Sequence, residues 1–234
     1  MYSFDAAVQQ LSTADGTGDS FYRPFLSLLP VTGASIATVG EFLGSETIAA
    51  SDPLAARLDE LQFDLGEGPC WQAMTSGQPV LTSDLRVDPA PLWPAFVQAV
   101  IETEVVAMFV FPLHVGPLRF GAIDLYSSRP HGLTEQQQDQ AQALAGIVGH
   151  HVLTRALERA GENQFEASTP YSRRVVHQAT GMVLAQLNIS AAEAHLLLQG
   201  HAFGSGRTMT DVSEDILRRR LAFIDEGNGI EVRE

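Results

Sequence analysis

The sequence predicts an α+β protein in which an antiparallel sheet flanked by helices is followed by a long connecting helix and three short helices. Three observations support this prediction. Strand-like and helix-like segments alternate over residues 20–128, apolar residues recur at helical spacing from 134 to about 160, and the pattern from 171 onward is purely helical. A chain of 234 residues with 45% hydrophobic content is large enough for two domains.

The first part of the chain carries the signals of the sheet and its flanking helices. Asp52 and Pro53 stand at the start of an apolar pattern, as the cap and the first residue of a helix. Two apolar strands that meet near Gly116 are expected at the centre of the sheet. In chain order we expect a helix at 20–30, a strand pair at 34–51, helices at 52–62 and 68–77, a strand at 79–82, a helix at 90–102 and the central strand pair at 105–128.

A longer helix is expected from residue 134 to about 160. Thr134 and Gln137 have the spacing of a capping box, and apolar residues then repeat at helical intervals. The next stretch, 161–170, is polar and contains Gly and Pro, as domain linkers often do. The sequence therefore predicts a first domain over residues 1–163 and a second domain over 164–234.

The second domain is expected to be a small helical bundle. Ser190 and Glu193 form a second capping box, and the glycines at 204 and 206 interrupt the helical pattern. The three helices are expected at roughly 172–187, 191–202 and 209–224.

The first of these three helices has two distinct faces. One face is apolar and should pack into the core, whereas the other combines Arg173, His177 and Thr180, with Arg174 and Gly181 beside them. Glycine inside a helix costs about 1 kcal/mol relative to alanine, so some other interaction must compensate. Two interpretations stay open: close packing of another helix, or close approach of a partner's backbone or base.

The third helix is expected to carry two apolar stripes. A bundle of three helices needs only one of them. The second stripe, formed by Leu217, Leu221 and Ile224, could contact another subunit or the first domain.

Arginine supplies all of the positive charge, because the chain has no lysine, and its net charge is -14. Residues 171–224 hold six arginines and four acids, so an anionic partner should meet this segment. Arg218 and Arg219 each follow an acid by four positions, which favours ion pairs. Arg220 has no acid at that spacing and is expected to be the freer charge, and Arg207 in the glycine turn could reach phosphate.

The second domain resembles the ANTAR domain, a three-helix module of bacterial antitermination regulators. The resemblance covers most of residues 171–224 and rests on Ala179, Gly181 and Met182, on Ile189 and Ser190 with Ala194 and Leu198, and on Asp211 and Val212 with Ile216. It implies binding to paired stem-loops in nascent RNA, prevention of a terminator hairpin, and a homodimer. The expected RNA contacts are Arg173, Arg174, His177, Thr180, Gly181, Arg207 and Arg220. Thr180 stands where the family often has lysine, which removes one expected phosphate contact.

Residues 20–158 resemble a GAF domain, a sensory module that commonly precedes ANTAR. The stretch 64–85, the segment 93–96 and the strand pair ending at Ser128 carry this resemblance, which implies a small-molecule signal. Phe63, Cys70, Trp71, Trp93, Phe96 and Phe111 are the candidate lining of a ligand pocket. The same aromatic residues could instead be core, because strands supply core aromatics at alternate positions. Likewise, Cys70 could be a redox sensor or a packed thiol.

Several classes of function are not expected. A single cysteine allows no internal disulfide, and the histidines show no zinc spacing. No signal peptide or membrane span is expected, which favours a cytoplasmic protein. We also expect no cofactor and no enzyme activity. The alternatives are a DNA-binding regulator, since three helices also suit helix-turn-helix, and a protein that binds or converts a small ligand without acting on RNA.

Overall fold

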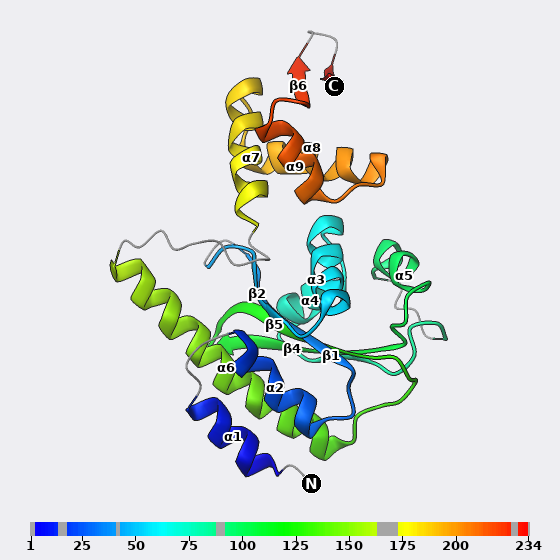
Figure 1. The fold of residues 1–234 in the computed structure, drawn as a ribbon, viewed down its shortest axis with the longest axis vertical. Coiled ribbons are helices and arrows are strands. Elements are labelled where there is room, and N and C mark those ends of the chain that lie inside the picture. The colour runs from blue at the N-terminus through cyan, green and yellow to red at the C-terminus, as the bar shows by residue number, and fades with distance from the viewer. Residues whose placement is uncertain are drawn as a thin grey trace. The chain divides into compact units, whose positions relative to one another are not determined.

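The computed structural model describes residues 3–13, 18–40, 43–87, 92–162, 173–225 and 229–233. The chain forms two compact units, Met1–Tyr171 and Ser172–Glu234 (Figure 1). The boundary predicted between residues 163 and 164 lies outside the described residues.

The first unit is built on a five-stranded antiparallel sheet with the strand order β2-β1-β5-β4-β3. The strands are β1 (Gly33–Thr38), β2 (Glu46–Ala50), β3 (Val80–Thr82), β4 (Ala107–Val115) and β5 (Leu118–Ser127). β5 lies at the centre and pairs with β4 from Ala107 opposite Ser127 to Val115 opposite Leu118. The expected central strand pair is therefore confirmed.

Helices cover both faces of this sheet (Figure 1). One core joins the sheet to α1 (Phe4–Ser12), α2 (Gly18–Leu28) and α6 (Glu135–Glu162). A separate core on the other face joins it to α3 (Pro53–Leu65), α4 (Pro69–Ser76) and α5 (Pro94–Val100). The Asp52 carboxylate accepts a hydrogen bond from the Ala55 amide at 2.9 Å, so the predicted cap of α3 is confirmed. α1 was not predicted from the sequence.

The second unit contains α7 (Arg174–Leu187), α8 (Ala191–Ser205) and α9 (Met209–Leu217). A hairpin of β6 (Ala222–Asp225) and β7 (Ile230–Arg233) follows. The predicted capping box at Ser190 and Glu193 is present at the start of α8. Apolar side chains from the three helices and β6 form the core of this unit: Val176, Ala179, Val183, Ala194, Leu198, Ala202, Met209, Val212, Ile216 and Phe223.

The prediction that the third helix continues to residue 224 is wrong, because α9 ends at Leu217. Arg219 adopts a left-handed conformation with φ of +58°, a position that glycine usually fills at the end of a helix. The amides of Arg219 and Arg220 donate to the carbonyls of Ile216 and Asp215, which together make a Schellman motif. The second apolar stripe therefore does not exist on a helix, and Leu221 is buried beyond the turn.

Candidate functional site

The outer face of α7 is polar, narrow and open. Arg174, His177, Gln178, Gly181 and Ala185 are all exposed along it. A Cβ atom added at Gly181 would meet nothing within 4 Å. Within the described residues, no helix packs against this glycine. The interpretation that Gly181 allows close packing of another helix is therefore not supported. The absence of a side chain instead leaves room for close approach from outside.

Two of the residues predicted on this face are buried. Arg173 precedes α7 and is only 6% exposed, and Thr180 is 9% exposed. The Thr180 hydroxyl donates a hydrogen bond to the Val176 carbonyl at 2.8 Å. Both side chains are largely hidden from solvent, so we remove them from the proposed set of contacts.

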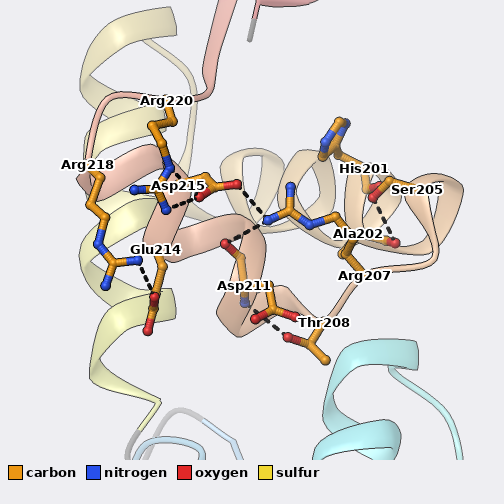
Figure 2. Close-up of polar contacts among 10 residues, drawn as sticks. All are labelled: His201, Ala202, Ser205, Arg207, Thr208, Asp211, Glu214, Asp215, Arg218 and Arg220. Atoms are coloured by element: carbon orange, nitrogen blue, oxygen red, sulfur yellow. Dashed lines mark hydrogen bonds and ion pairs between the residues drawn. The ribbon is translucent and has the colours of Figure 1, made fainter.

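A second group of charged side chains gathers around the carboxyl end of α9. Asp215 lies between Arg207 and Arg220 (Figure 2). Arg207 Nη2 is 2.6 Å from one carboxylate oxygen of Asp215, and Arg220 Nε is 2.9 Å from the other. The expectation that Arg220 is the freer charge is therefore wrong. The turn that ends α9 brings Arg220 back onto Asp215, which spacing along a continuous helix could not reveal.

The remaining two arginines of this group differ from each other. Arg218 pairs with Glu214 at 2.5 Å, as the spacing predicts. Arg219 does not pair with Asp215 as predicted; it is exposed and makes no ion pair with any carboxylate in the described part of the chain. We call Arg207, Arg218, Arg219 and Arg220 the arginine cluster.

Among the ion pairs of the described residues, three guanidinium groups of the arginine cluster share the carboxylates of Glu214 and Asp215. The side chains of Arg218 and Arg220 are still 56% and 55% exposed. Each guanidinium has five N–H donors, so pairing with one carboxylate leaves donors for a second anion.

Asp215→Asn should make the stability of the second unit less dependent on pH in the acid range. Hydrogen bonds from Arg207 and then Arg220 hold the pKa of the Asp215 carboxyl below its usual value. A lowered pKa contributes stability that is present above about pH 4 and is lost as the pH falls through the folded value. Thermal unfolding should therefore show a lower midpoint for the variant at pH 7, and a gap that narrows below pH 4.

Glu214→Gln is the control for Asp215→Asn, because Glu214 pairs with a single arginine. It should lower the midpoint at pH 7 by less than Asp215→Asn does. A gap between Asp215→Asn and the wild type that stays constant from pH 7 to pH 3 would contradict the assigned role of Asp215.

The candidate pocket residues of the first unit do not form one pocket. Phe63, Cys70, Trp93 and Phe96 are buried, with Phe63 the most exposed at 7%. Phe111 belongs to the core on the opposite face of the sheet, because alternate residues of β4 face opposite sides. The prediction that Phe111 shares a site with the other five is therefore wrong. The structure also favours the packed thiol for Cys70, which is 2% exposed.

Two of the predicted residues border an open depression beside α4. Trp71 and Trp93 line it, and its volume is about 450 Å³. Trp93 Nε1 donates to the side chain of Gln72 at 2.8 Å, and Glu67 accepts from the Phe96 amide at 2.9 Å. Gly66, Glu67, Gly68, Gln72, Thr75, Ser76 and Leu92 complete the lining. The depression thus offers the partly exposed ring of Trp71 with polar groups at fixed positions.

Gln62 holds the walls of this depression together and was missed in the sequence. Its side-chain carbonyl accepts from the Cys70 amide at 2.7 Å, its amide donates to Asp124, and its backbone carbonyl accepts from Trp71 Nε1 at 2.7 Å. Gly68 has φ of +138°, and a Cβ atom there would lie 2.6 Å from Gln62. The signal that could have found Gln62 is its place four residues after buried Leu58, on the inner face of α3.

The described residues lack two further classes of site. They contain no group of three or more His, Cys, Asp or Glu side chains placed to hold a metal ion. No single described helix is long and apolar enough to span a membrane, and only the bent pair of α7 and α8 together meets that test of length and composition.

Comparisons with known proteins match both units. A family model of the GAF domain matches residues 21–152, and one of the ANTAR domain matches residues 169–217. No curated protein matches the chain. The GAF domain of a phosphoenolpyruvate-protein phosphotransferase from Coxiella burnetii has a TM-score of 0.53 and 14% identity, covering 67% of this chain and 94% of that one. The corresponding domain from Acinetobacter has a TM-score of 0.52 and 12% identity, covering 70% and 95%. At these identities the likeness concerns the fold alone.

Proposed function

Because the chain belongs to the GAF domain family and carries a C-terminal ANTAR domain, we propose that it is a cytoplasmic, signal-responsive regulator of transcription. In this proposal the second unit binds paired stem-loops in nascent RNA and prevents a terminator hairpin from forming. The first unit receives a small-molecule signal. Both domains are regulatory, so we assign no reaction to the chain.

The open outer face of α7 is the observation that best supports RNA binding. Gly181 lies in the middle of the helix with open space around it, and Arg174 and His177 are exposed on the same face. Glycine lowers the stability of the helix relative to alanine, and on the surface of α7 no contact within the described part of the unit compensates for this loss. A sugar-phosphate backbone or an unstacked base can approach such a face closely, with Arg174 placed to contact phosphate.

The arginine cluster supplies the other positive charge in this proposal. The pair of Arg218 and Glu214 is exposed. Exposed ion pairs contribute only about 0–1 kcal/mol, so a phosphate that displaces Glu214 from Arg218 meets little resistance. The internal pairs also hold the guanidinium groups in place before RNA arrives. Because the net charge of residues 171–224 is small, binding to one stem-loop should be modest. Two linked stem-loops that engage two copies of the chain should bind more tightly.

Recognition of duplex DNA is the second candidate, and the composition of α9 argues against it. In helix-turn-helix proteins a recognition helix carries Arg, Asn or Gln side chains to the base edges. α9 has the sequence MTDVSEDIL, with three acids and none of those residues. Such a helix would be repelled by the phosphates of a major groove.

The proposal is tested by binding of the full chain to three nucleic acids of equal length: RNA with two stem-loops, RNA with one stem-loop, and duplex DNA. The two-stem-loop RNA should bind at least about tenfold more tightly than the DNA, a difference of about 1.4 kcal/mol. The double variant Arg174→Gln/Arg219→Gln should lose most of this binding. Arg57→Gln, an exposed arginine of the first unit, is the matched control. Equal or tighter binding to DNA, or no loss in the double variant, would overturn the proposal.

The depression beside α4 is the site that we propose for the signal. The partly exposed ring of Trp71 suits a flat or apolar molecule, while Glu67 and Gln72 can orient its polar groups. Native mass spectrometry of the purified chain would show a retained small molecule. Trp71→Ala should then reduce its occupancy.

A further inference from the structure

α8 has an unusual distribution of apolar residues. It buries Ala194, Leu198 and Ala202 in the core, yet its opposite side exposes Leu196 at 63% and Phe203 at 67%. In this helix of 15 residues, Glu193 is the only Asp, Glu, Lys or Arg. A helix that is apolar on both sides is normally covered on both sides. The outward side of α8 therefore has the composition of a contact surface.

Small and large residues alternate along this outward side in the order Ala192, Leu196, Gly200 and Phe203, all of them exposed. A Cβ atom added at Gly200 would meet nothing within 4 Å, so this position is an open notch. When a second copy of the helix is laid antiparallel, Leu196 faces the partner's Gly200 and Phe203 faces the partner's Ala192. Each large side chain then meets a small one, in both directions, as a two-fold contact requires.

The charge of the chain also favours a second copy as the occupant of this surface. The net charge of the whole chain is -14, so most pairs of surfaces would repel each other. The outward side of α8 carries a single carboxylate, that of Glu193, and therefore brings two copies together at little electrostatic cost. RNA and anionic membranes fit it poorly, because they require the basic side chains that this side lacks.

We propose that α8 pairs antiparallel with α8 of a second copy of the chain, with Leu196 seated against Gly200 of the partner helix. Four residues per copy bury less than the roughly 1,200 Å² of a stable protein interface, so the contact is weak and reversible between separate chains. Any link that holds two chains together strengthens it through effective concentration. The proposal goes beyond RNA binding and does not depend on it.

Disulfide trapping without RNA tests this contact directly in the full chain. Leu196→Cys and Gly200→Cys are prepared separately, and the native Cys70 is buried and should stay silent. Because a disulfide needs Cα atoms within about 7 Å, an equimolar mixture under mild oxidation should give at least about fivefold more covalent dimer than either variant alone. The mixed link joins residue 196 of one copy to residue 200 of the other.

The other outcomes of trapping all count against the proposal. Dimer formed mainly by Leu196→Cys alone would show that Leu196 meets Leu196 of the partner, in a parallel pair or another register. No dimer in any sample would show that α8 does not meet a second copy. In addition, Gly200→Ala should leave the unit folded and reduce the concentration-dependent self-association of the full chain measured by sedimentation velocity, whereas Gly181→Ala should not. Since no RNA is present, failure here is distinct from failure of RNA binding.

Discussion

Gly181→Leu should weaken binding to stem-loop RNA at least about tenfold, equivalent to about 1.4 kcal/mol, while the second unit stays folded. The added side chain has open space within the unit, so it creates no internal clash. It would instead stand where RNA must approach α7. Removing a glycine from a helix should also raise the free energy of unfolding by up to about 1 kcal/mol. Fluorescence anisotropy with a labelled single stem-loop measures the affinity, and urea unfolding measures the stability.

Gly146→Leu is the matched control for Gly181→Leu. Gly146 lies within α6 of the first unit, and a Cβ atom there also meets nothing within 4 Å. The control should leave RNA affinity within about twofold of the wild type, a difference of roughly 0.4 kcal/mol. Unchanged affinity in Gly181→Leu would show that the outer face of α7 does not contact RNA, whatever the arginine cluster does.

Leu198→Ala should destabilise the second unit by about 2–5 kcal/mol, whereas Leu196→Ala should change its stability by less than about 0.5 kcal/mol. Both leucines lie on α8, but Leu198 is fully buried and Leu196 is 63% exposed. A unit as small as Ser172–Glu234 has little stability to spare, so the first change should leave much of it unfolded.

Hydrogen exchange of peptides from α8 distinguishes the two leucine variants. Leu198→Ala should exchange its α8 amides at nearly the unprotected rate, and Leu196→Ala should keep the protection of the wild type in dilute solution. Equal loss of protection in both variants would contradict the assignment of the two faces of α8. It would also remove the basis of the proposed pairing between copies.

Local signals were sufficient for most of the fold. The strand pair around Gly116 was predictable because Gly116 and Pro117 alone separate two long apolar strands, which leaves a two-residue turn. Helix starts at Asp52 and Ser190 were predictable because their side chains satisfy free amides of the first turn. These features depend on residues close in sequence, which a single chain displays directly.

The end of α9 was not predictable, for a physical reason. A helix that ends in a Schellman motif usually announces its end with glycine, but here Arg219 takes the left-handed position. The helical pattern of the sequence therefore continues past Arg220, and the hairpin of β6 and β7 was not predicted. The pairing of Arg220 with Asp215 follows from the same turn.

For the candidate sites, the sequence indicated segments of the chain more reliably than individual residues. The charge distribution favours the second unit as the place where an anionic partner binds. Charge does not reveal burial, however, so Arg173 and Thr180 were included among the surface groups although both are buried. In the first unit, the sequence grouped Phe111 with Phe63, Cys70, Trp71, Trp93 and Phe96 as the lining of one pocket. It could not separate Phe111 from the others, because that separation depends on which side of the sheet a residue faces.

The salt dependence of RNA binding tests the central claim most directly. The logarithm of the association constant for two-stem-loop RNA is measured between 50 and 200 mM salt for the wild type and for Arg174→Gln/Arg219→Gln. Each phosphate contact contributes about 0.7–0.9 to the slope, so the double variant should bind more weakly with a slope shallower by about 1.5. Identical affinities and slopes for the two proteins would show that these guanidinium groups do not contact RNA, and would contradict the account.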